Sequence, residues 1–192
     1  SLKGMHNAAN ALAAICTCKL LGVESKVVAE ALAKMRGVRH RIEPIAEIGG
    51  VTYIDDSKGT NVDATLTALE CMQAETVLLL GGKDKGEDFD KLFTGLRDSR
   101  AVHAVLYGEN RFKLLASAVK QGYSQVTLCA GFELAVKIAA MTAKCGQCVL
   151  LSPASSSFDM FSGYEERGDR FCEIVAGLQG ERKGAGEEFC VE

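Results

Sequence analysis

Residues 77–92 read VLLLGGKDKGEDFDKL, and this stretch indicates the fold class. The apolar run Val77–Leu80 is typical of a strand buried on both faces, because it lacks the alternation of a half-exposed strand. A glycine-rich polar loop follows it, and a helical pattern then begins at Phe89. A second run of the same kind, CVLL, begins at Cys148. Strands covered on both faces predict a parallel sheet between two layers of helices.

The same alternation of strand and helix extends to both sides of this stretch. Two strands near residue 50 are predicted to form a hairpin through Gly49-Gly50. We therefore predict an α/β fold with a Rossmann-like, mostly parallel, doubly wound sheet. The predicted strands are Ile45–Ile48, Val51–Asp55, Val77–Leu80, Ala104–Tyr107, Gln125–Leu128 and Cys148–Ser152, and the predicted helices are Asn61–Met72, Phe89–Leu96, Arg111–Gln121, Phe132–Lys144 and Glu165–Leu178.

Two helices rich in alanine and leucine precede the sheet. We predict them at Ala8–Leu21 and Glu24–Met35, and each ends near a glycine, as helix C-termini commonly do. We expect residues 1–37 to be the helical end of a preceding domain and residues 38–180 to be a complete domain. The polar, glycine-rich residues 181–192 are expected to be a flexible tail. The chain does not begin with methionine and has no signal-peptide pattern, so we expect it to be part of a longer protein.

Composition and charge exclude several classes of protein. The 192 residues are 47% hydrophobic and 24% charged, which is typical of a globular protein and not of a disordered one. The net charge of −3 argues against nucleic acid or an anionic membrane as the main partner. No apolar run approaches the roughly 18–20 residues of a membrane span.

The eight cysteines are spread along the chain and give no disulfide framework. Several lie inside predicted helices or strands, where a free cysteine behaves as a small hydrophobic residue, and this use fits a reducing cytoplasm. Cys145 and Cys148 form a CxxC motif, for which a redox or zinc site is the alternative interpretation. The motif lies between a helix and a strand, the reverse of the thioredoxin order, and no second pair has metal-ligand spacing.

Polar residues follow four of the predicted strands. The carboxyl ends of parallel strands meet at one edge of a sheet, where open α/β sheets bind their ligands. This edge offers lysines, hydroxyls and helix N-termini together, so it suits an anionic ligand such as a carboxylate or a phosphate. The alternative is that these residues only form turns and helix caps. The four segments are DSKGTN (56–61), GGKDKG (81–86), GEN (108–110) and SPASSS (152–157).

Taken together, five segments resemble the Mur ligases, which form amide bonds at the expense of ATP. The segments occur in the family's order and the resemblance covers residues 4–178. Within the family the chain is most similar to the member that adds D-glutamate. The five segments are GMHNAAN (4–10), GVRHRIE (37–43), DDSKGTNVDAT (55–65), LLLGGKDKGEDFDKL (78–92) and SPASSSFDMFSGYEERGDRF (152–171).

The resemblance implies a reaction of peptidoglycan precursor synthesis in the cytoplasm. ATP phosphorylates the carboxylate of UDP-MurNAc-L-alanine to an acyl phosphate, the amine of D-glutamate attacks it, and ADP and phosphate leave. The chain contains no phosphate loop. We therefore expect the phosphate loop, the Mg²⁺ ligands and the UDP-binding domain in N-terminal and central domains outside this chain. We expect the chain alone to be inactive and to supply part of a composite active site.

The resemblance also implies which residues bind the substrates. It assigns no catalytic residue and no metal ligand to this chain. At position 164 the family more often has phenylalanine, and the contact there is made by the main chain or by the ring. The implied D-glutamate contacts are Lys58, Thr60, Lys85, Ser157 and Tyr164. The implied ATP contacts are Asn7 and Asn10 to the adenine, Asp56 to the ribose, Arg41 to the phosphates, and His40 next to the nucleotide.

Other interpretations stay open at this point. The first alternative is another amino-acid-adding ligase of the Mur or folylpolyglutamate type, and the amino acid bound near Lys85 and Ser157 discriminates these enzymes. The second is a non-catalytic nucleotide-binding module, which predicts nucleotide binding and indifference to glutamate. The third is a purely structural domain, in which the loss of Lys85 has little effect on activity.

Overall fold

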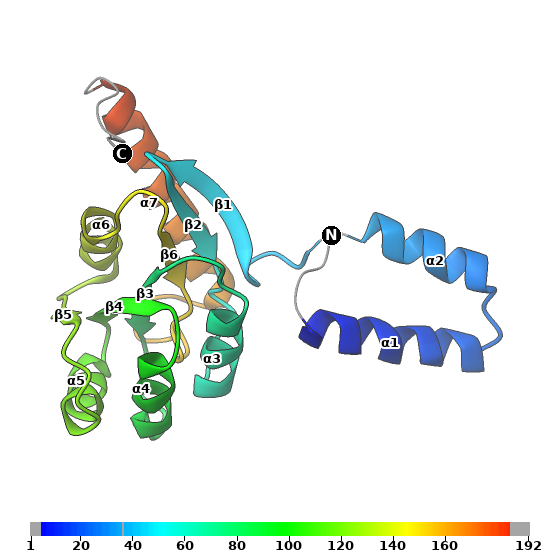
Figure 1. The fold of residues 1–192 in the computed structure, drawn as a ribbon, viewed down its shortest axis with the longest axis horizontal. Coiled ribbons are helices and arrows are strands. Elements are labelled where there is room, and N and C mark those ends of the chain that lie inside the picture. The colour runs from blue at the N-terminus through cyan, green and yellow to red at the C-terminus, as the bar shows by residue number, and fades with distance from the viewer. Residues whose placement is uncertain (1–4, 36, 185–192) are drawn as a thin grey trace. The chain divides into compact units, whose positions relative to one another are not determined.

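The computed structural model describes residues 5–35 and 37–184, with side chains for residues 8–35 and 37–179 (Figure 1). The chain divides into two compact units, Ser1–Arg39 and His40–Glu192, and each is described by itself. None of the helices in the described ranges is long and apolar enough to cross a membrane.

The first unit contains the two predicted helices, α1 (Met5–Leu20) and α2 (Ser25–Lys34). Helix α1 ends where Gly22 takes a positive φ of 78°. The Gly22 N–H donates to the Lys19 carbonyl at 3.0 Å and the Val23 N–H donates to the Cys18 carbonyl at 2.9 Å. These two bonds form the glycine-dependent C-cap that the sequence predicts. Helix α2 buries none of its side chains within this unit.

The second unit contains a six-stranded sheet in the order β1-β2-β6-β3-β4-β5. The hairpin of β1 (Glu43–Ile48) and β2 (Val51–Asp55) is antiparallel and turns at Gly49-Gly50, as predicted. All other neighbouring strands are parallel. The remaining strands are β3 (Thr76–Gly81), β4 (Ala101–Tyr107), β5 (Val126–Leu128) and β6 (Cys148–Leu151). The predicted α/β fold with a mostly parallel sheet is confirmed.

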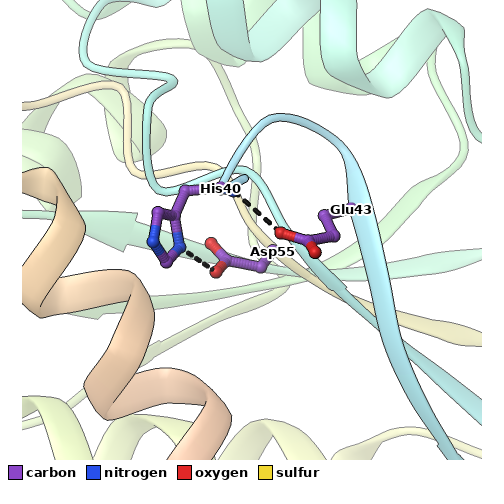
Figure 2. A group of neighbouring side chains, drawn as sticks. All are labelled: His40, Glu43 and Asp55. Atoms are coloured by element: carbon purple, nitrogen blue, oxygen red, sulfur yellow. Dashed lines mark hydrogen bonds and ion pairs between the residues drawn. The ribbon is translucent and has the colours of Figure 1, made fainter. Parts of the chain in front are cut away.

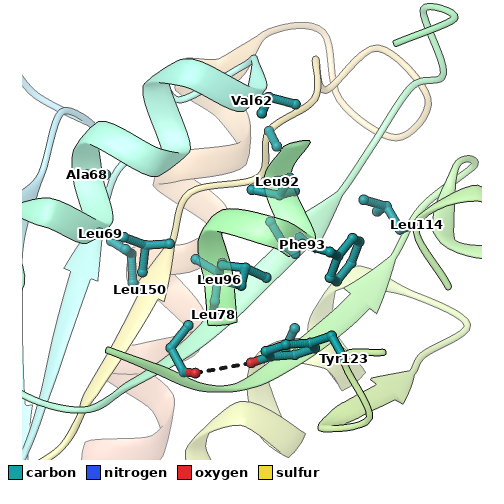
Figure 3. Packing of buried hydrophobic residues seen from close by; sticks show 14 of the residues in the cluster. Val62, Ala68, Leu69, Leu78, Leu92, Phe93, Leu96, Leu114, Tyr123 and Leu150 are labelled. Atoms are coloured by element: carbon teal, nitrogen blue, oxygen red, sulfur yellow. Dashed lines mark hydrogen bonds between the residues drawn. The ribbon is translucent and has the colours of Figure 1, made fainter. Parts of the chain in front are cut away.

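Helices cover both faces of the sheet (Figure 1). Along β3, Leu78 and Leu80 pack into one core and Val77 and Leu79 into the other, because successive side chains of a strand point to opposite faces. One face is covered by α3 (Val62–Glu70), α4 (Asp90–Arg97) and α5 (Arg111–Lys120), and its leucine- and phenylalanine-rich core is shown in Figure 3. The other face is covered by α6 (Phe132–Thr142) and α7 (Tyr164–Gly184).

Two expectations from the sequence need comment. Helix α7 continues to Gly184, six residues beyond the predicted end at Leu178, so residues 181–184 of the expected flexible tail are helical and the rest lie outside the described residues. Cys148 is buried as the first residue of β6, while Cys145 lies exposed before it.

Candidate functional site

The loops that follow β3 and β6 are joined by backbone hydrogen bonds at the carboxyl edge of the sheet. The Gly81 N–H donates to the Pro153 carbonyl at 3.0 Å, and the Lys83 N–H donates to the Ser156 carbonyl at 2.9 Å. Lys83 and Ser156 also form an isolated antiparallel bridge. The GGKDKG and SPASSS segments therefore lie side by side, although about 70 residues of sequence separate them.

The loop that follows β4 joins the same edge through side chains. The Gly82 N–H donates to Asn110 Oδ1 at 3.1 Å, and Asn110 Nδ2 donates to Ser155 Oγ at 2.8 Å. The Glu109 N–H donates to Asp159 Oδ2 at 3.0 Å. Asn110 is buried, so its amide acts as an internal connection between three loops.

The glycine pair of GGKDKG is required by this close packing. Both residues have positive φ values, 136° at Gly81 and 148° at Gly82. A Cβ atom on Gly81 would lie 1.9 Å from the Tyr107 carbonyl oxygen, and one on Gly82 would lie 2.1 Å from the Ser156 carbonyl oxygen. No other residue type fits either position without movement of the backbone.

A buried arginine connects the loop after β2 to the loop after β6. Arg167 in α7 is fully buried, and its Nη2 donates to the Ser57 carbonyl at 2.8 Å while its Nε donates to Ser57 Oγ at 3.0 Å. Its Nη1 donates to the Ser155 carbonyl at 3.0 Å. The planar guanidinium thus fixes the two loops that carry Lys58 and Ser157.

His40, Glu43 and Asp55 form a cluster beside these loops (Figure 2). His40 is buried in a left-handed conformation with φ 60°, and its Nδ1 lies 2.7 Å from Asp55 Oδ2. The His40 N–H donates to Glu43 Oε2 at 2.9 Å, and the Ser57 N–H donates to Asp55 Oδ1 at 2.8 Å. The second ring nitrogen, Nε2, lies 3.8 Å from Asp169 Oδ1. The cluster therefore orients the imidazole through its own hydrogen bonds.

The same cluster is the place where the described residues come nearest to a metal site. Its three ligand atoms lie within 4.8 Å of one another. Mg²⁺ prefers an octahedron of oxygen ligands, whereas this cluster offers an imidazole nitrogen and carboxylates that already accept hydrogen bonds. The cluster does not fit Mg²⁺, and we assign no metal ligand in the described residues.

Asp56, next in sequence to Asp55, has different partners. Its Oδ2 accepts a hydrogen bond from Ser152 Oγ at 2.6 Å, and its Oδ1 accepts one from the Ile42 N–H at 3.2 Å. Burial raises the pKa of Asp56 to about 6, although both hydrogen bonds and the charge of Arg41 favour its ionised form. Ile42 itself has a φ of 47°, which is rare for a β-branched residue, so the Asp56 contact holds a strained backbone.

Lys58 and Thr60 follow on the same loop. The Lys58 N–H donates to the His40 carbonyl at 3.0 Å, and its Nζ donates to Tyr164 Oη at 2.9 Å. The Tyr164 carbonyl accepts a hydrogen bond from Ser57 Oγ at 2.8 Å. The N–H of Thr60 donates to the Lys58 carbonyl at 2.9 Å. Thr60 is half-buried.

Ion pairs of the two residues before Lys85 hold the GGKDKG loop. Lys83 Nζ lies 2.6 Å from Glu109 Oε2, and Lys113 Nζ lies 3.0 Å from Asp84 Oδ1. The Glu109 hydrogen bond raises the pKa of Lys83. Lys85 is exposed and takes no part in these two ion pairs. The loop therefore offers Lys85 as a cation at the edge of the sheet.

The structure brings most of the sequence-predicted residues of the second unit together. Asn10 is exposed on α1 in the first unit, and the side chain of Asn7 lies outside the described residues. Arg41 is exposed, and its charge acts on Asp56. The contacts above join five residues at the carboxyl edge, and the buried Ser157 lies two residues after Ser155, which Arg167 holds. Lys85 is exposed on the adjoining loop. The five joined residues are His40, Asp56, Lys58, Thr60 and Tyr164.

Sequence reasoning missed the buried residues whose hydrogen bonds connect the segments of this edge. Arg167, Asn110 and Asp55 are all buried and each connects segments that are distant in sequence. A charged or amide residue inside a helical or strand pattern is usually solvated, so the pattern gives no signal for such a contact. The available signal was that Asp55 and Arg167 lie inside segments that carry the resemblance, and that Asn110 lies in the polar GEN segment after a predicted strand.

The fold and its edge define a doubly wound α/β domain with lysines, hydroxyls and a buried carboxylate at the carboxyl ends of its strands. A family model described as "Mur ligase, glutamate ligase domain" matches residues 40–155, more than half of the chain. The chain belongs to the Mur ligase family.

Two curated relatives carry the same name, UDP-N-acetylmuramoylalanine–D-glutamate ligase. The one from Pelotomaculum thermopropionicum is 44% identical over 178 residues, and the one from Dechloromonas aromatica is 43% identical over 179 residues. Each alignment covers 93% of this chain and 39% of the relative. The chain therefore spans about two-fifths of the length of these relatives.

Solved structures show the same fold at low sequence identity. The UDP-N-acetylmuramate-alanine ligase MurC of Thermotoga maritima aligns with a TM-score of 0.70 at 19% identity, over 94% of this chain and 39% of that one. The folylpolyglutamate synthase of the same organism aligns with a TM-score of 0.56 at 16% identity, over 80% of this chain and 37% of that one. These similarities concern the fold alone.

Proposed function

We propose that this chain is the D-glutamate- and ATP-contacting part of a ligase that adds D-glutamate to UDP-MurNAc-L-alanine in peptidoglycan precursor synthesis. The observation that carries the proposal is the connection of the Lys58 and Ser157 loops by the buried Arg167, beside a loop that exposes Lys85. The names and identities of the curated relatives support the choice of D-glutamate.

D-glutamate carries two carboxylates, and the edge offers two lysines for them. Lys58 and Lys85 would form charge-assisted hydrogen bonds to the carboxylates, while the hydroxyls of Thr60 and Ser157 would fix their orientation. Tyr164 would contribute its main chain, which Ser57 holds in place. None of these groups is a nucleophile or a general base, so the domain would act by orienting the amine of D-glutamate toward an acyl phosphate.

The nucleotide would lie next to this amino-acid site. Asp56 would bind the ribose, Arg41 would reach the phosphates and His40 would lie beside the nucleotide. Asn7 and Asn10 would contact the adenine from the first unit, which we propose to be the end of the central ATP-binding domain. Mg²⁺, the phosphate loop and the UDP-binding domain would lie in domains outside this chain, and the assembled enzyme would be cytoplasmic. The chain alone would be inactive.

Two measurements test this proposal. The first is an amide-NMR titration of the chain with D-glutamate, with L-glutamate as the matched control. We expect shifts for the D isomer only, at Lys58, Thr60, Lys85 and Ser157. Equal shifts with both isomers would indicate a general anion-binding edge and contradict the choice of D-glutamate.

The second measurement uses a chimaeric ligase in which this chain replaces the matching segment of the Pelotomaculum thermopropionicum relative. We expect ATP-dependent formation of UDP-MurNAc-L-alanyl-D-glutamate and no product with L-glutamate. A chimaera that prefers L-glutamate or a diamino acid would favour another amino-acid-adding ligase. A chimaera that folds and binds ATP without using any amino acid, joined to a silent titration, would favour a nucleotide-binding module.

A further inference from the structure

Lys58 and Tyr164 form a contact between two segments that lie 106 residues apart in the sequence. Lys58 Nζ donates a hydrogen bond to Tyr164 Oη at 2.9 Å. The same nitrogen lies 4.2 Å from the centroid of the Tyr164 ring, so the cation also faces the π-electrons. The ammonium is thus held by the hydroxyl and by the ring of one residue.

The backbone at both ends of this contact is fixed independently of it. Ser57 Oγ donates to the Tyr164 carbonyl at 2.8 Å, and the buried guanidinium of Arg167 holds Ser57. The Lys58 N–H donates to the carbonyl of His40 at 3.0 Å. The Tyr164 hydroxyl is therefore needed neither for the loop nor for the start of α7, and its contact orders only the lysine side chain.

The hydroxyl also has the hydrogen-bond polarity that this contact requires. A hydroxyl donates once and accepts twice, so it accepts from the Lys58 ammonium while its proton is free for another partner. A hydrogen bond from Tyr164 lowers the pKa of Glu165, and the positive charge of Lys58 acts in the same direction. The Lys58 ammonium and the Glu165 carboxylate therefore both favour the orientation of the O–H bond in which the hydroxyl oxygen accepts from Lys58.

A free lysine side chain has four rotatable carbon–carbon bonds, and ordering it costs conformational entropy. A lysine that is already ordered loses less entropy when its ligand binds. The Tyr164 hydroxyl uses one of the three ammonium N–H bonds, and two remain for a carboxylate. Lys58 is half-buried at the edge of the sheet.

We propose that Tyr164 is a positioning residue whose hydroxyl holds the Lys58 ammonium in the orientation that receives a carboxylate of D-glutamate. This inference rests on the proposed function and adds to it a role for the hydroxyl, which is distinct from a main-chain contact of the same residue. Tyr164 acts on the substrate through Lys58 and takes no part in the chemistry itself.

The test is a double-mutant cycle with Tyr164→Phe and Lys58→Met in the chimaeric ligase. Tyr164→Phe keeps the ring and the backbone, so the protein folds, and we expect the KM for D-glutamate to rise about fivefold with kcat nearly unchanged. In the Lys58→Met background, Tyr164→Phe should have no further effect, because the group on which it acts is gone. Tyr123→Phe is the matched control, since its hydroxyl donates to the Ala101 carbonyl at 3.1 Å, and its KM should equal that of the parent.

A second readout does not depend on the ligase reaction. In the 192-residue chain, the ammonium protons of Lys58 should exchange slowly enough for detection by nitrogen-15 NMR and should lose this protection in Tyr164→Phe. An unchanged KM in Tyr164→Phe, or effects of the two substitutions that simply add, would overturn this inference and leave the proposed function intact. A parent chimaera that rejects D-glutamate would instead overturn the proposed function.

Discussion

Gly168 of α7 lies against the imidazole of His40 with no space for a side chain. A Cβ atom at position 168 would lie 2.1 Å from His40 Nδ1, the atom that contacts Asp55. The ring cannot easily move away, because both His40 and Asp55 are buried and hydrogen-bonded. Helix α7 therefore packs directly against the His40 imidazole at Gly168, the residue that follows Arg167.

This packing predicts opposite effects of two glycine-to-alanine substitutions in α7. Gly168→Ala should lower the free energy of unfolding by about 2 kcal/mol or more, because the methyl group overpacks a site that cannot relax. Gly177→Ala should raise it by about 0.5–1 kcal/mol, because a methyl group there meets no atom within 4 Å and alanine favours the helix. Urea unfolding of the two variants measures both effects. Equal changes would show that the helix is not held against His40.

The raised pKa of Asp56 predicts a specific pH dependence of the free energy of unfolding. Its pKa is about 6 in the folded chain and 3.8 when unperturbed, so the unfolded chain releases this proton first as the pH rises. The contribution of Asp56 to the free energy of unfolding is therefore largest below pH 4 and is lost as the pH rises through about 6. Asp56→Asn cannot ionise, and its stability relative to the parent should increase by up to about 3 kcal/mol between pH 4 and pH 7.

Urea unfolding of the parent and of Asp56→Asn at several pH values measures this difference directly. Other carboxyl groups titrate in the same range, but they are common to both proteins and cancel in the comparison. A difference that stays constant from pH 4 to pH 7 would contradict the raised pKa of Asp56.

The removal of the buried hydroxyls of Tyr107 and Tyr123 should have different effects on the free energy of unfolding. Within the described part of the chain, Tyr107 Oη has no hydrogen-bond partner, and burial raises the pKa of Tyr107 to about 12. Tyr107→Phe should therefore leave the free energy of unfolding unchanged or raise it by about 1 kcal/mol. Tyr123→Phe should lower it by about 1 kcal/mol, because Tyr123 Oη donates to the Ala101 carbonyl (Figure 3). A loss of stability in Tyr107→Phe that matches the loss in Tyr123→Phe would contradict this assignment.

The fold was predictable because its signals are local. The continuous run Val77–Leu80 indicates burial on both faces, and in the structure its side chains alternate between two cores. The end of α7 was not predictable in the same way. The pattern after Leu178 is polar and contains glycine, so it gives no apolar stripe that marks a helix, yet α7 continues to Gly184.

The candidate site was only half predictable, because its supports are long-range. Lys58 and Ser157 stand in segments whose composition suggests an anion site, and parallel topology brings such segments together. Arg167 reaches Ser57 across 110 residues, and Asp55 reaches His40 across 15. Contacts of this kind depend on the packing of α7 against the sheet, and no periodicity in the sequence encodes them.

Among the side chains of the second unit, we expect the removal of Lys85 to have the largest effect on activity. The ion pairs of Lys83 and Lys113 hold its loop in place, so removal of the Lys85 ammonium should leave the fold unchanged. Lys85→Met in the chimaeric ligase should lower kcat/KM for D-glutamate by about a hundredfold or more, as expected when a substrate-positioning charge is deleted. Lys91→Met is the matched control, because Lys91 is also exposed but pairs with Asp63 on the outer surface, and its activity should equal that of the parent.

The outcome for Lys85 decides between a ligand site and turn chemistry at the carboxyl edge. If GGKDKG only forms a turn, its glycines and its backbone hydrogen bonds to the β6 loop are sufficient for its role. The kcat/KM of Lys85→Met for D-glutamate should then stay within about threefold of that of the parent. If the edge binds D-glutamate, the loss should fall on D-glutamate and spare the KM for ATP, because the ammonium is placed for a carboxylate and not for the nucleotide. Steady-state kinetics with each substrate varied in turn separates these two results.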